Sequence, residues 1–86
     1  MIYKNWNKQT TLILKAHLVE KSMRYHDLAI ALKEMGIQES QSTIASKLCR
    51  GTFSFAFFLQ CMHALEVKQI DLNHELYMDI TLGCDF

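Results

Sequence analysis

The chain has 86 residues, half of them apolar, with nine basic residues against nine acidic ones and therefore no formal net charge. A length of this order makes one domain with one core. The balanced charge removes the simplest indication of nucleic-acid binding, since the non-specific part of that affinity comes from lysine and arginine neutralising phosphates. No apolar run approaches the ~20 residues of a membrane-spanning helix, so no membrane association is expected.

Glycine and proline usage indicates the fold class. The chain has no proline, and its three glycines are Gly36, Gly51 and Gly83. Such usage favours helices joined by short turns over strands joined by tight hairpins. The fold is therefore predicted to be all-α.

The charges are unevenly distributed along the chain. Residues 1–26 carry five basic residues against one acidic residue, whereas residues 66–86 carry one basic residue against five acidic ones. The first segment thus has a net charge of +4 and the last a net charge of −4. A basic front and an acidic rear could orient the molecule on a DNA duplex. Charge runs are as often simply solvated faces, and both interpretations stay open.

The first predicted helix begins near Thr10 or Thr11, because either hydroxyl can cap the amides of a first turn. Trp6 lies just upstream, where a large aromatic side chain can close over the end of the core. The apolar residues of this helix form a broad set rather than one stripe: Leu12, Leu14, Ala16, Leu18 and Val19.

A second helix is predicted over residues 25–33, with Asp27 complementing the positive end of its dipole. Gly36 stands where a helix ends in a left-handed residue, and Ile37 is placed to pack just after it. Apolar residues at i, i+3, i+4 and i+7 are expected to form one narrow buried face: Leu28, Ala31, Leu32 and Met35.

A third helix is predicted to open at Ser40 or Gln41 and to end at Gly51. Ile44 and Leu48 turn inward, with Ala45 or Cys49 as further inward candidates. Two short helices joined by a glycine turn form the scaffold with which a helix-turn-helix reaches DNA base edges. Side chains of the outward face can bond base edges or phosphates. The competing interpretation is that its Ser and Thr side chains only cap and solvate a short helix. The outward residues are Gln41, Ser42, Thr43, Ser46, Lys47 and Arg50.

A fourth helix is predicted from about Ser54 to Leu65. Phe53 or Phe57 would be left over for a contact between two copies of the chain. An apolar series at helical spacing is expected to face the core: Phe55, Phe58, Leu59, Met62 and Leu65.

The segment 68–86 is predicted to be an appendage to a helix-turn-helix domain that spans residues 1–67. Asn73 can cap a short helix over residues 74–82. The alternating apolar and polar pattern of residues 67–72 gives a competing interpretation, a strand that pairs across a dimer. In either form the appendage is a plausible dimerisation element, and helix-turn-helix proteins use dimers to span two half-sites.

The sequence contains no residue pattern typical of a catalytic or metal-binding site. Cys49, Cys61 and Cys84 are an odd number without a Cys-x-x-Cys spacing, so neither a disulfide framework nor a zinc ribbon is expected. Free thiols are typical of a reducing cytoplasm, where we expect the protein. No glycine loop could cradle a phosphate. We expect no enzymatic activity, no metal and no other cofactor, since the histidines are also scattered without an i, i+4 pair: His17, His26, His63 and His74.

Several segments resemble a known class of DNA-binding domain. Residues 25–67 resemble the lambda-repressor-like (Cro/CI, XRE-type) helix-turn-helix domains. The residues that carry this likeness are Leu28-Ala29 in the second helix, Gln41-Ser42-Thr43-Ile44 opening the third, and Arg50-Gly51 closing it. The resemblance implies a compact bundle of four or five helices, no catalysis, and recognition by the third helix.

Residues 6–67 look more closely similar to a group of small bacterial domains of unknown function placed in that class. The shared positions include Trp6, Leu14-Lys15, Leu28-Ala29, Leu32, Gly36-Ile37 and the run Arg50-Gly51-Thr52-Phe53-Ser54 with Phe57-Phe58-Leu59-Gln60-Cys61.

One departure from the repressor pattern is the spacing of the two helices. Fifteen positions separate Ala29 from Ile44, compared with roughly ten in the ordinary motif. The extra residues lengthen the second helix and the turn, which affects the docking angle. Glu34 and Glu39 also bring negative charge close to the proposed surface.

The leading hypothesis is a small bacterial or phage-type transcriptional regulator, repressor-like, that binds double-stranded DNA sequence-specifically as a homodimer. The alternative is a non-enzymatic protein-interaction module, antitoxin-like or partner-regulating, that keeps the fold without DNA binding and uses exposed phenylalanines or the acidic C-terminal segment. In the leading hypothesis, base edges are approached by Gln41, Ser42, Thr43 and Ser46, phosphate or guanine is bound by Lys47 and Arg50, and the flanking backbone is held by Arg24 and Lys21.

Overall fold

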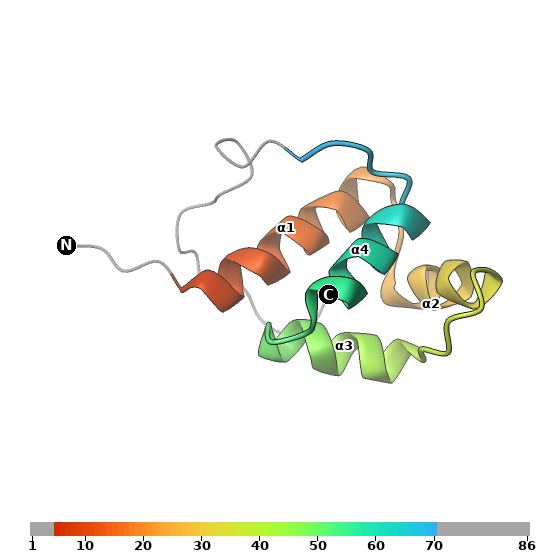
Figure 1. Ribbon diagram of the computed structural model, residues 1–86, viewed down its shortest axis with the longest axis horizontal. Helices are drawn as coiled ribbons and strands as arrows, with labels where there is room; N and C mark the ends of the chain where they lie inside the picture. The colour runs from red at the N-terminus through yellow and green to blue at the C-terminus, as the bar shows by residue number, and fades with distance from the viewer. Residues whose placement is uncertain (1–4, 71–86) are drawn as a thin grey trace.

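The computed structural model describes residues 5–70, which form four α-helices and no strand (Figure 1). Both α3 and α4 contact both α1 and α2, so the two halves of the chain enclose one core. The predicted all-α bundle is confirmed for these residues. The helices are α1 (Trp6–Glu20), α2 (Tyr25–Glu34), α3 (Gln41–Arg50) and α4 (Phe55–Ala64).

The start of α1 differs from the prediction. Asn5 caps the helix, because its Oδ1 accepts a hydrogen bond of 3.1 Å from the Lys8 amide. An Asn cap satisfies one of the free amides of the first turn as well as a Thr cap does. Thr10 and Thr11 therefore lie inside the helix. The Thr11 hydroxyl instead donates to the Leu48 carbonyl of α3 at 2.7 Å.

Every helix in the described range is followed by a residue with a left-handed backbone. After α2, the Gly36 amide donates to the Lys33 carbonyl and the Ile37 amide donates to the Leu32 carbonyl, both at 2.9 Å. These two bonds form a Schellman motif, as predicted for Gly36. The left-handed residues are Ser22 (φ 56°), Gly36 (84°), Gly51 (70°) and Glu66 (60°).

Serine side chains begin the last two helices at the predicted places. Ser40 Oγ accepts from the Thr43 amide at 3.1 Å, and Ser54 Oγ accepts from the Phe57 amide at 3.0 Å. Each bond satisfies an amide that has no partner within its own helix. The bounds predicted for α3 and α4 are thus confirmed to within a residue.

Leucine and isoleucine pairs spaced four residues apart form the centre of the core. Because residues at i and i+4 lie on one helix face, each pair turns a single stripe inward. Deleting one such side chain costs about 2–5 kcal/mol. The pairs are Leu14 and Leu18 of α1, Leu28 and Leu32 of α2, and Ile44 and Leu48 of α3, all with no exposed surface.

The buried face of α4 was only partly predicted. Phe55 is 72% exposed and Leu59 is 52% exposed, whereas Phe57 is 4% exposed. Nearly every residue of this helix is apolar, so two overlapping helical series were available, and the one through Phe57, Cys61 and Leu65 faces the core. Phe57 also packs edge-on against Phe53, with ring centroids 5.3 Å apart.

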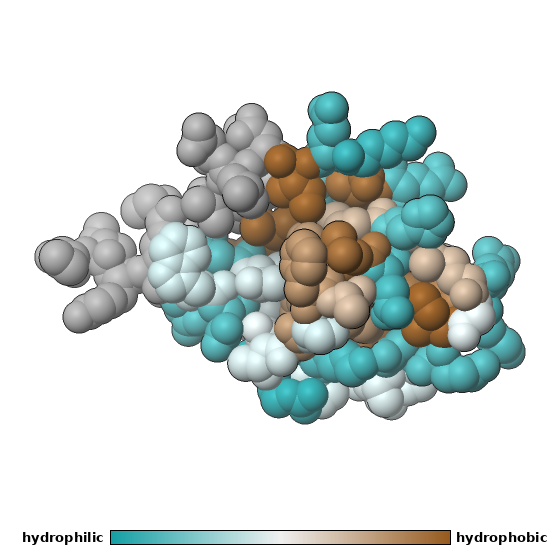
Figure 2. Space-filling view, in the orientation of Figure 1, coloured by the Kyte–Doolittle hydropathy of each residue, from teal (hydrophilic) through white to brown (hydrophobic). Residues whose placement is uncertain are grey.

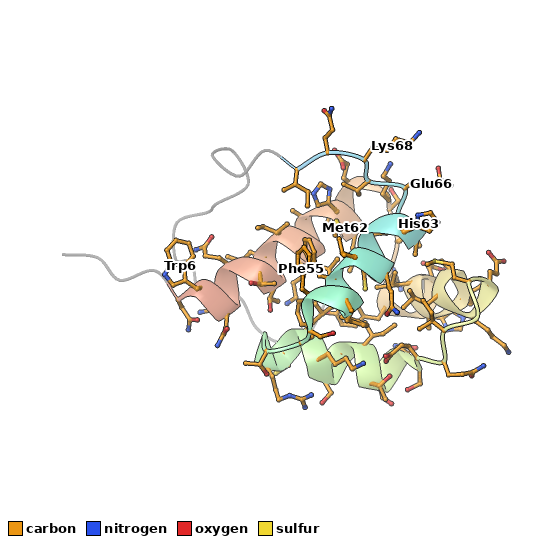
Figure 3. All side chains as sticks on the ribbon, in the orientation of Figure 1. Trp6, Phe55, Met62, His63, Glu66 and Lys68 are labelled. Atoms are coloured by element: carbon orange, nitrogen blue, oxygen red, sulfur yellow. The ribbon has the colours of Figure 1, made fainter. Side chains whose placement is uncertain are left out.

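Trp6 and Met35, which were predicted to pack at the core, are exposed, and so is Val19 of the broad apolar set in α1. Trp6 belongs to the first turn of α1 rather than to a segment before it, and Figure 3 shows it at the far end of that helix from Lys68. Val19 follows the buried Leu18 and is rotated from it by about 100° on the helix. Met35 lies beyond the end of α2.

Cysteine chemistry also differs from the expectation of free thiols. Cys61 is free and buried, and burial, together with the nearby Glu39 charge, raises the pKa of its thiol to about 12. Cys49 is disulfide-bonded, so the expectation is wrong at this residue, since an odd cysteine count does not prevent one pair from forming.

The predicted C-terminal helix over residues 74–82 lies outside the described residues. Residues 67–70 form neither helix nor strand, so the described part of the 67–72 segment does not show the predicted strand. None of the four described helices has both the length and the apolar character needed to cross a membrane.

Candidate nucleic-acid interface

The connection between α2 and α3 is long. It consists of residues 35–40, because α2 ends at Glu34 and α3 begins at Gln41. An ordinary helix-turn-helix has a turn of about 3–4 residues. The lengthened turn predicted from the sequence is therefore present, and α2 and α3 still pack against one another.

The outer face of α3 is polar and contains no carboxylate. Ile44 and Leu48 anchor the opposite face in the core with no exposed surface. Figure 2 shows hydrophilic residues along the lower edge, where α3 lies in Figure 1, and hydrophobic residues across the centre of the molecule. Of the six residues predicted to face outward, Lys47 is half-buried, and the others are exposed: Gln41, Ser42, Thr43, Ser46 and Arg50.

Glu39, in the turn before α3, holds two of the predicted contact residues. Its Oε2 accepts from the Lys47 ammonium, and its Oε1 accepts from the Thr43 hydroxyl at 2.8 Å. The Lys47 ammonium also lies 4.5 Å from the centroid of the Phe57 ring of α4. The negative charge expected near the interface is therefore paired with a cation of α3.

The ionisation of Glu39 follows from these contacts. Burial alone raises the pKa of a carboxyl group, because it removes water from the charged form. The hydrogen bonds from Lys47 and Thr43 and the Lys47 charge outweigh burial, so the pKa of Glu39 lies below its usual value. Glu39 is consequently an ionised acceptor at neutral pH.

The Thr43 hydroxyl is part of the start of α3. Thr43 Oγ1 accepts from the Ser40 amide at 2.9 Å, and the Thr43 amide donates to Ser40 Oγ at 3.1 Å. These reciprocal bonds form a capping box. Thr43 therefore takes part in helix capping, which was the competing interpretation for the Ser and Thr side chains of this helix.

The C-terminal half of the outer face combines Ser46 with Arg50. Arg50 Nη1 donates to Ser46 Oγ at 3.0 Å. The guanidinium is exposed, and its planar fork of donors suits bidentate contact with a guanine edge or a phosphate. Ser42, Ser46 and Arg50 follow one another at intervals of four residues, so they share one face of α3. Gln41, at the start of the helix, is rotated by about 140° from Ser46.

Lys21 and Arg24 lie on a different connection, between α1 and α2. Both are exposed. Lys21 is the C-terminal cap residue of α1, and Arg24 precedes α2, where its amide donates to Asp27 Oδ2 at 2.9 Å. The structure therefore does not bring these two cations into the Ser46–Arg50 cluster.

Sequence reasoning missed the part played by Glu39, which it treated only as unfavourable charge. A signal was present, since Glu39, Thr43 and Lys47 follow one another at intervals of four residues. Residues at this spacing share one face of a helix or of its N-terminal extension. Among the described residues, no group of three or more His, Cys, Asp or Glu side chains could hold a metal ion.

The described residues form a small all-α bundle in which one helix, α3, presents a polar outer face. The chain belongs to the family described as "Domain of unknown function (DUF6471)", which matches residues 6–70. No curated protein and no solved structure matches the chain.

Proposed function

We propose that this protein is a small, sequence-specific DNA-binding regulator of transcription that acts in the cytoplasm as a homodimer. The observation that carries the proposal is the outer face of α3, which is exposed, polar and free of carboxylates, and which ends in the exposed Arg50. A rigid core anchor through Ile44 and Leu48 holds that face in place. Small polar residues with a terminal arginine suit a helix that enters the major groove.

The roles of the α3 residues follow from their contacts. Gln41, Ser42 and Ser46 approach base edges, and Arg50 binds guanine or a phosphate. Lys47 is held between Glu39 and Phe57, so it adds positive potential to the surface. Thr43 positions the start of the helix through its capping bonds, while its methyl group can contact a base edge. Lys21 and Arg24 are assigned to flanking phosphates.

The exposed apolar residues of α4 favour a dimer. Phe55 and Leu59 are more than half exposed, and the Phe55 ring stacks on Phe58 with centroids 6.1 Å apart. Figures 2 and 3 show that Phe55 lies within the hydrophobic centre of this face. Exposed apolar patches of this kind mark protein contacts, and a dimer aligns two recognition helices on two half-sites.

The test is fluorescence anisotropy with the duplex upstream of the protein's own gene and with a scrambled duplex, each at low and near-physiological salt. A regulator binds the upstream duplex more tightly than the scrambled one, and the affinity falls as salt rises. Absence of binding to both duplexes at low salt would overturn the proposal.

A second candidate function is a protein-interaction module that keeps this fold without DNA binding. The exposed Phe55 and Leu59 favour it, because the same apolar face could bind another protein. Phe55→Ser distinguishes the two functions. If the protein binds DNA, Phe55→Ser weakens dimerisation, while the monomer keeps its salt-dependent contact with DNA. If the protein is an interaction module, Phe55→Ser abolishes capture of a co-purifying partner, and neither wild type nor the variant binds DNA.

A further inference from the structure

The proposed function leaves one feature of α3 without a role, the disulfide bond at Cys49. Cys49 lies in the last turn of the helix, where it is exposed and disulfide-bonded. Ser46 and Ser42 precede it by three and seven positions, a spacing that places all three residues on one side of a helix. Arg50 follows Cys49 directly. The bond therefore stands beside the surface that we assign to DNA.

The chain offers one partner for this bond. It has three cysteines, and Cys61 is free and buried. Burial raises the pKa of the Cys61 thiol to about 12, so at neutral pH almost none of it is the thiolate that exchanges with disulfides. The remaining cysteine is Cys84, which lies outside the described residues.

The length of chain after Ile70 allows this pairing. Figure 1 shows the blue segment that follows α4 at the opposite edge of the molecule from α3. Fourteen positions separate Ile70, the last described residue, from Cys84, and a chain of this length spans up to about 46–50 Å. The longest dimension of the molecule is 44 Å. Cys84 is therefore within reach of Cys49.

The segment that such a bond holds is acidic. DNA binding depends on a positive surface, because lysine and arginine replace the counterions of the phosphates. Carboxylates tethered beside Arg50 lower the potential at the end of α3. Residues 71–86 contain neither lysine nor arginine, and they carry four acidic residues: Asp71, Glu75, Asp79 and Asp85.

We infer that a disulfide between Cys49 and Cys84 holds the acidic segment beside α3 and weakens DNA binding, and that reduction of this bond restores the affinity. The inference rests on the proposed function and gives it a redox control. In the oxidised form, the carboxylates compete with DNA phosphates for Arg50. Disulfides of cytoplasmic proteins are commonly transient or redox-sensing, and exposed ones are the more easily reduced.

The reductant is a dithiol. Its first thiolate attacks one sulfur of the bond, forms a mixed disulfide and expels the other cysteine as a thiolate. Its second thiolate then displaces the first cysteine. The two electrons come from the dithiol, which leaves as a cyclic disulfide, and its two protons pass to Cys49 and Cys84.

The first test maps the bond in the full chain after exposure to glutathione disulfide. Under denaturing conditions, alkylation should label Cys61 alone, and mass spectrometry of a digest should find the Cys49 and Cys84 peptides linked. After dithiothreitol, all three cysteines should be labelled. Three labelled cysteines without dithiothreitol, a bond between two copies of the chain, or a mixed disulfide at Cys49 would overturn the inference.

The second test measures the affinity of the oxidised and reduced full chain for the upstream duplex by anisotropy. Reduction should raise the affinity about 5- to 150-fold, the usual range of coupling between two sites. Cys84→Ser should bind like the reduced wild type with or without dithiothreitol. Cys61→Ala is the matched control and should keep the response. Glu75→Gln combined with Asp79→Asn keeps the bond and should diminish the response, because it removes two charges.

The outcomes distinguish this inference from the proposed function. Equal affinities of the oxidised and reduced forms would overturn the redox control and leave DNA binding intact. A full response in the combined charge variant would overturn the part assigned to the carboxylates. If neither form binds a duplex at low salt, the proposed function fails, and redox control of DNA binding fails with it, whichever cysteines are linked.

Discussion

Glu39 and Lys47 form an ion pair that joins the turn before α3 to the middle of that helix. The Glu39 side chain is 11% exposed and the Lys47 side chain is 31% exposed, so solvent screens the pair only partly. The Phe57 ring covers the other side of the ammonium group. The Lys47 side chain thus connects the turn before α3 to the core, because Phe57 is itself buried.

Replacing Glu39 with Gln should destabilise the fold. The amide keeps the size of the carboxylate but loses its charge, and a hydrogen bond to a charged group contributes about 1.5–3 kcal/mol. We expect the free energy of unfolding in urea to fall by about 1–3 kcal/mol. Glu34→Gln is the matched control, since Glu34 is exposed at the end of α2 and should change stability by less than about 0.5 kcal/mol. Equal losses in both variants would show that the Glu39–Lys47 ion pair does not stabilise the fold.

The same ion pair predicts a pH dependence. The pKa of Glu39 is lower in the folded state than its usual value of 4.5, so its stabilising contribution is complete above that value. The contribution is lost as pH falls from about the unfolded value through the folded one. Unfolding curves of wild type and Glu39→Gln should therefore differ at pH 7 and converge in acid. A difference that stays constant down to the acid transition would show that ionised Glu39 contributes nothing.

Two glycines with the same backbone conformation should respond differently to alanine. Gly36 and Gly51 both have positive φ, which costs an alanine about 1–2 kcal/mol. A Cβ at Gly36 meets nothing within 4 Å, whereas one at Gly51 collides with the Asn7 backbone. Gly51→Ala should therefore lose about 1–3 kcal/mol more than Gly36→Ala through overpacking. Thermal or urea unfolding measures both values, and equal losses would show that α1 and α3 are not in close contact.

Two phenylalanines of α4 offer a test of which face is buried. Phe57→Ala should cost about 3–5 kcal/mol, because it empties a filled core position. Phe55→Ala changes a largely exposed side chain and should cost less than about 1 kcal/mol. The comparison is made by urea unfolding of the two variants. A larger loss of stability in Phe55→Ala than in Phe57→Ala would support the buried face predicted from the sequence and contradict the packing of α4.

The elements that could be predicted from the sequence are those whose local signals agree. Ser40, Gly36 and Gly51 mark the bounds of α2 and α3 through capping chemistry that depends on a few neighbouring residues. The inward Ile44 and Leu48 were also predictable, because they are the only large aliphatic residues of α3. In α4 this contrast is missing, and only packing against the other helices selects Phe57 over Phe55.

The contacts within the candidate site were harder to predict. The Glu39–Lys47 pair depends on how the turn joins α3, and the hydrogen bond from Thr11 to the Leu48 carbonyl depends on how two distant helices pack. The spacing of Glu39, Thr43 and Lys47 at intervals of four residues gives a short-range signal for the ion pair, whereas the contact between α1 and α3 produces no pattern within a short stretch of sequence.

The ends of α1 and α4 were also hard to predict. Ser22 and Glu66 have left-handed backbones there, and only a glycine at such a position would have indicated this conformation in the sequence.

The most direct test of the account is the affinity of Arg50→Ala for the upstream duplex, measured by anisotropy beside wild type and Lys68→Ala. Both variants remove one positive charge, but only Arg50 lies on the outer face of α3. If that face binds DNA, Arg50→Ala weakens binding by about 1–3 kcal/mol and Lys68→Ala leaves it nearly unchanged. Unchanged affinity in Arg50→Ala, or an equal loss in both variants, would contradict recognition by α3.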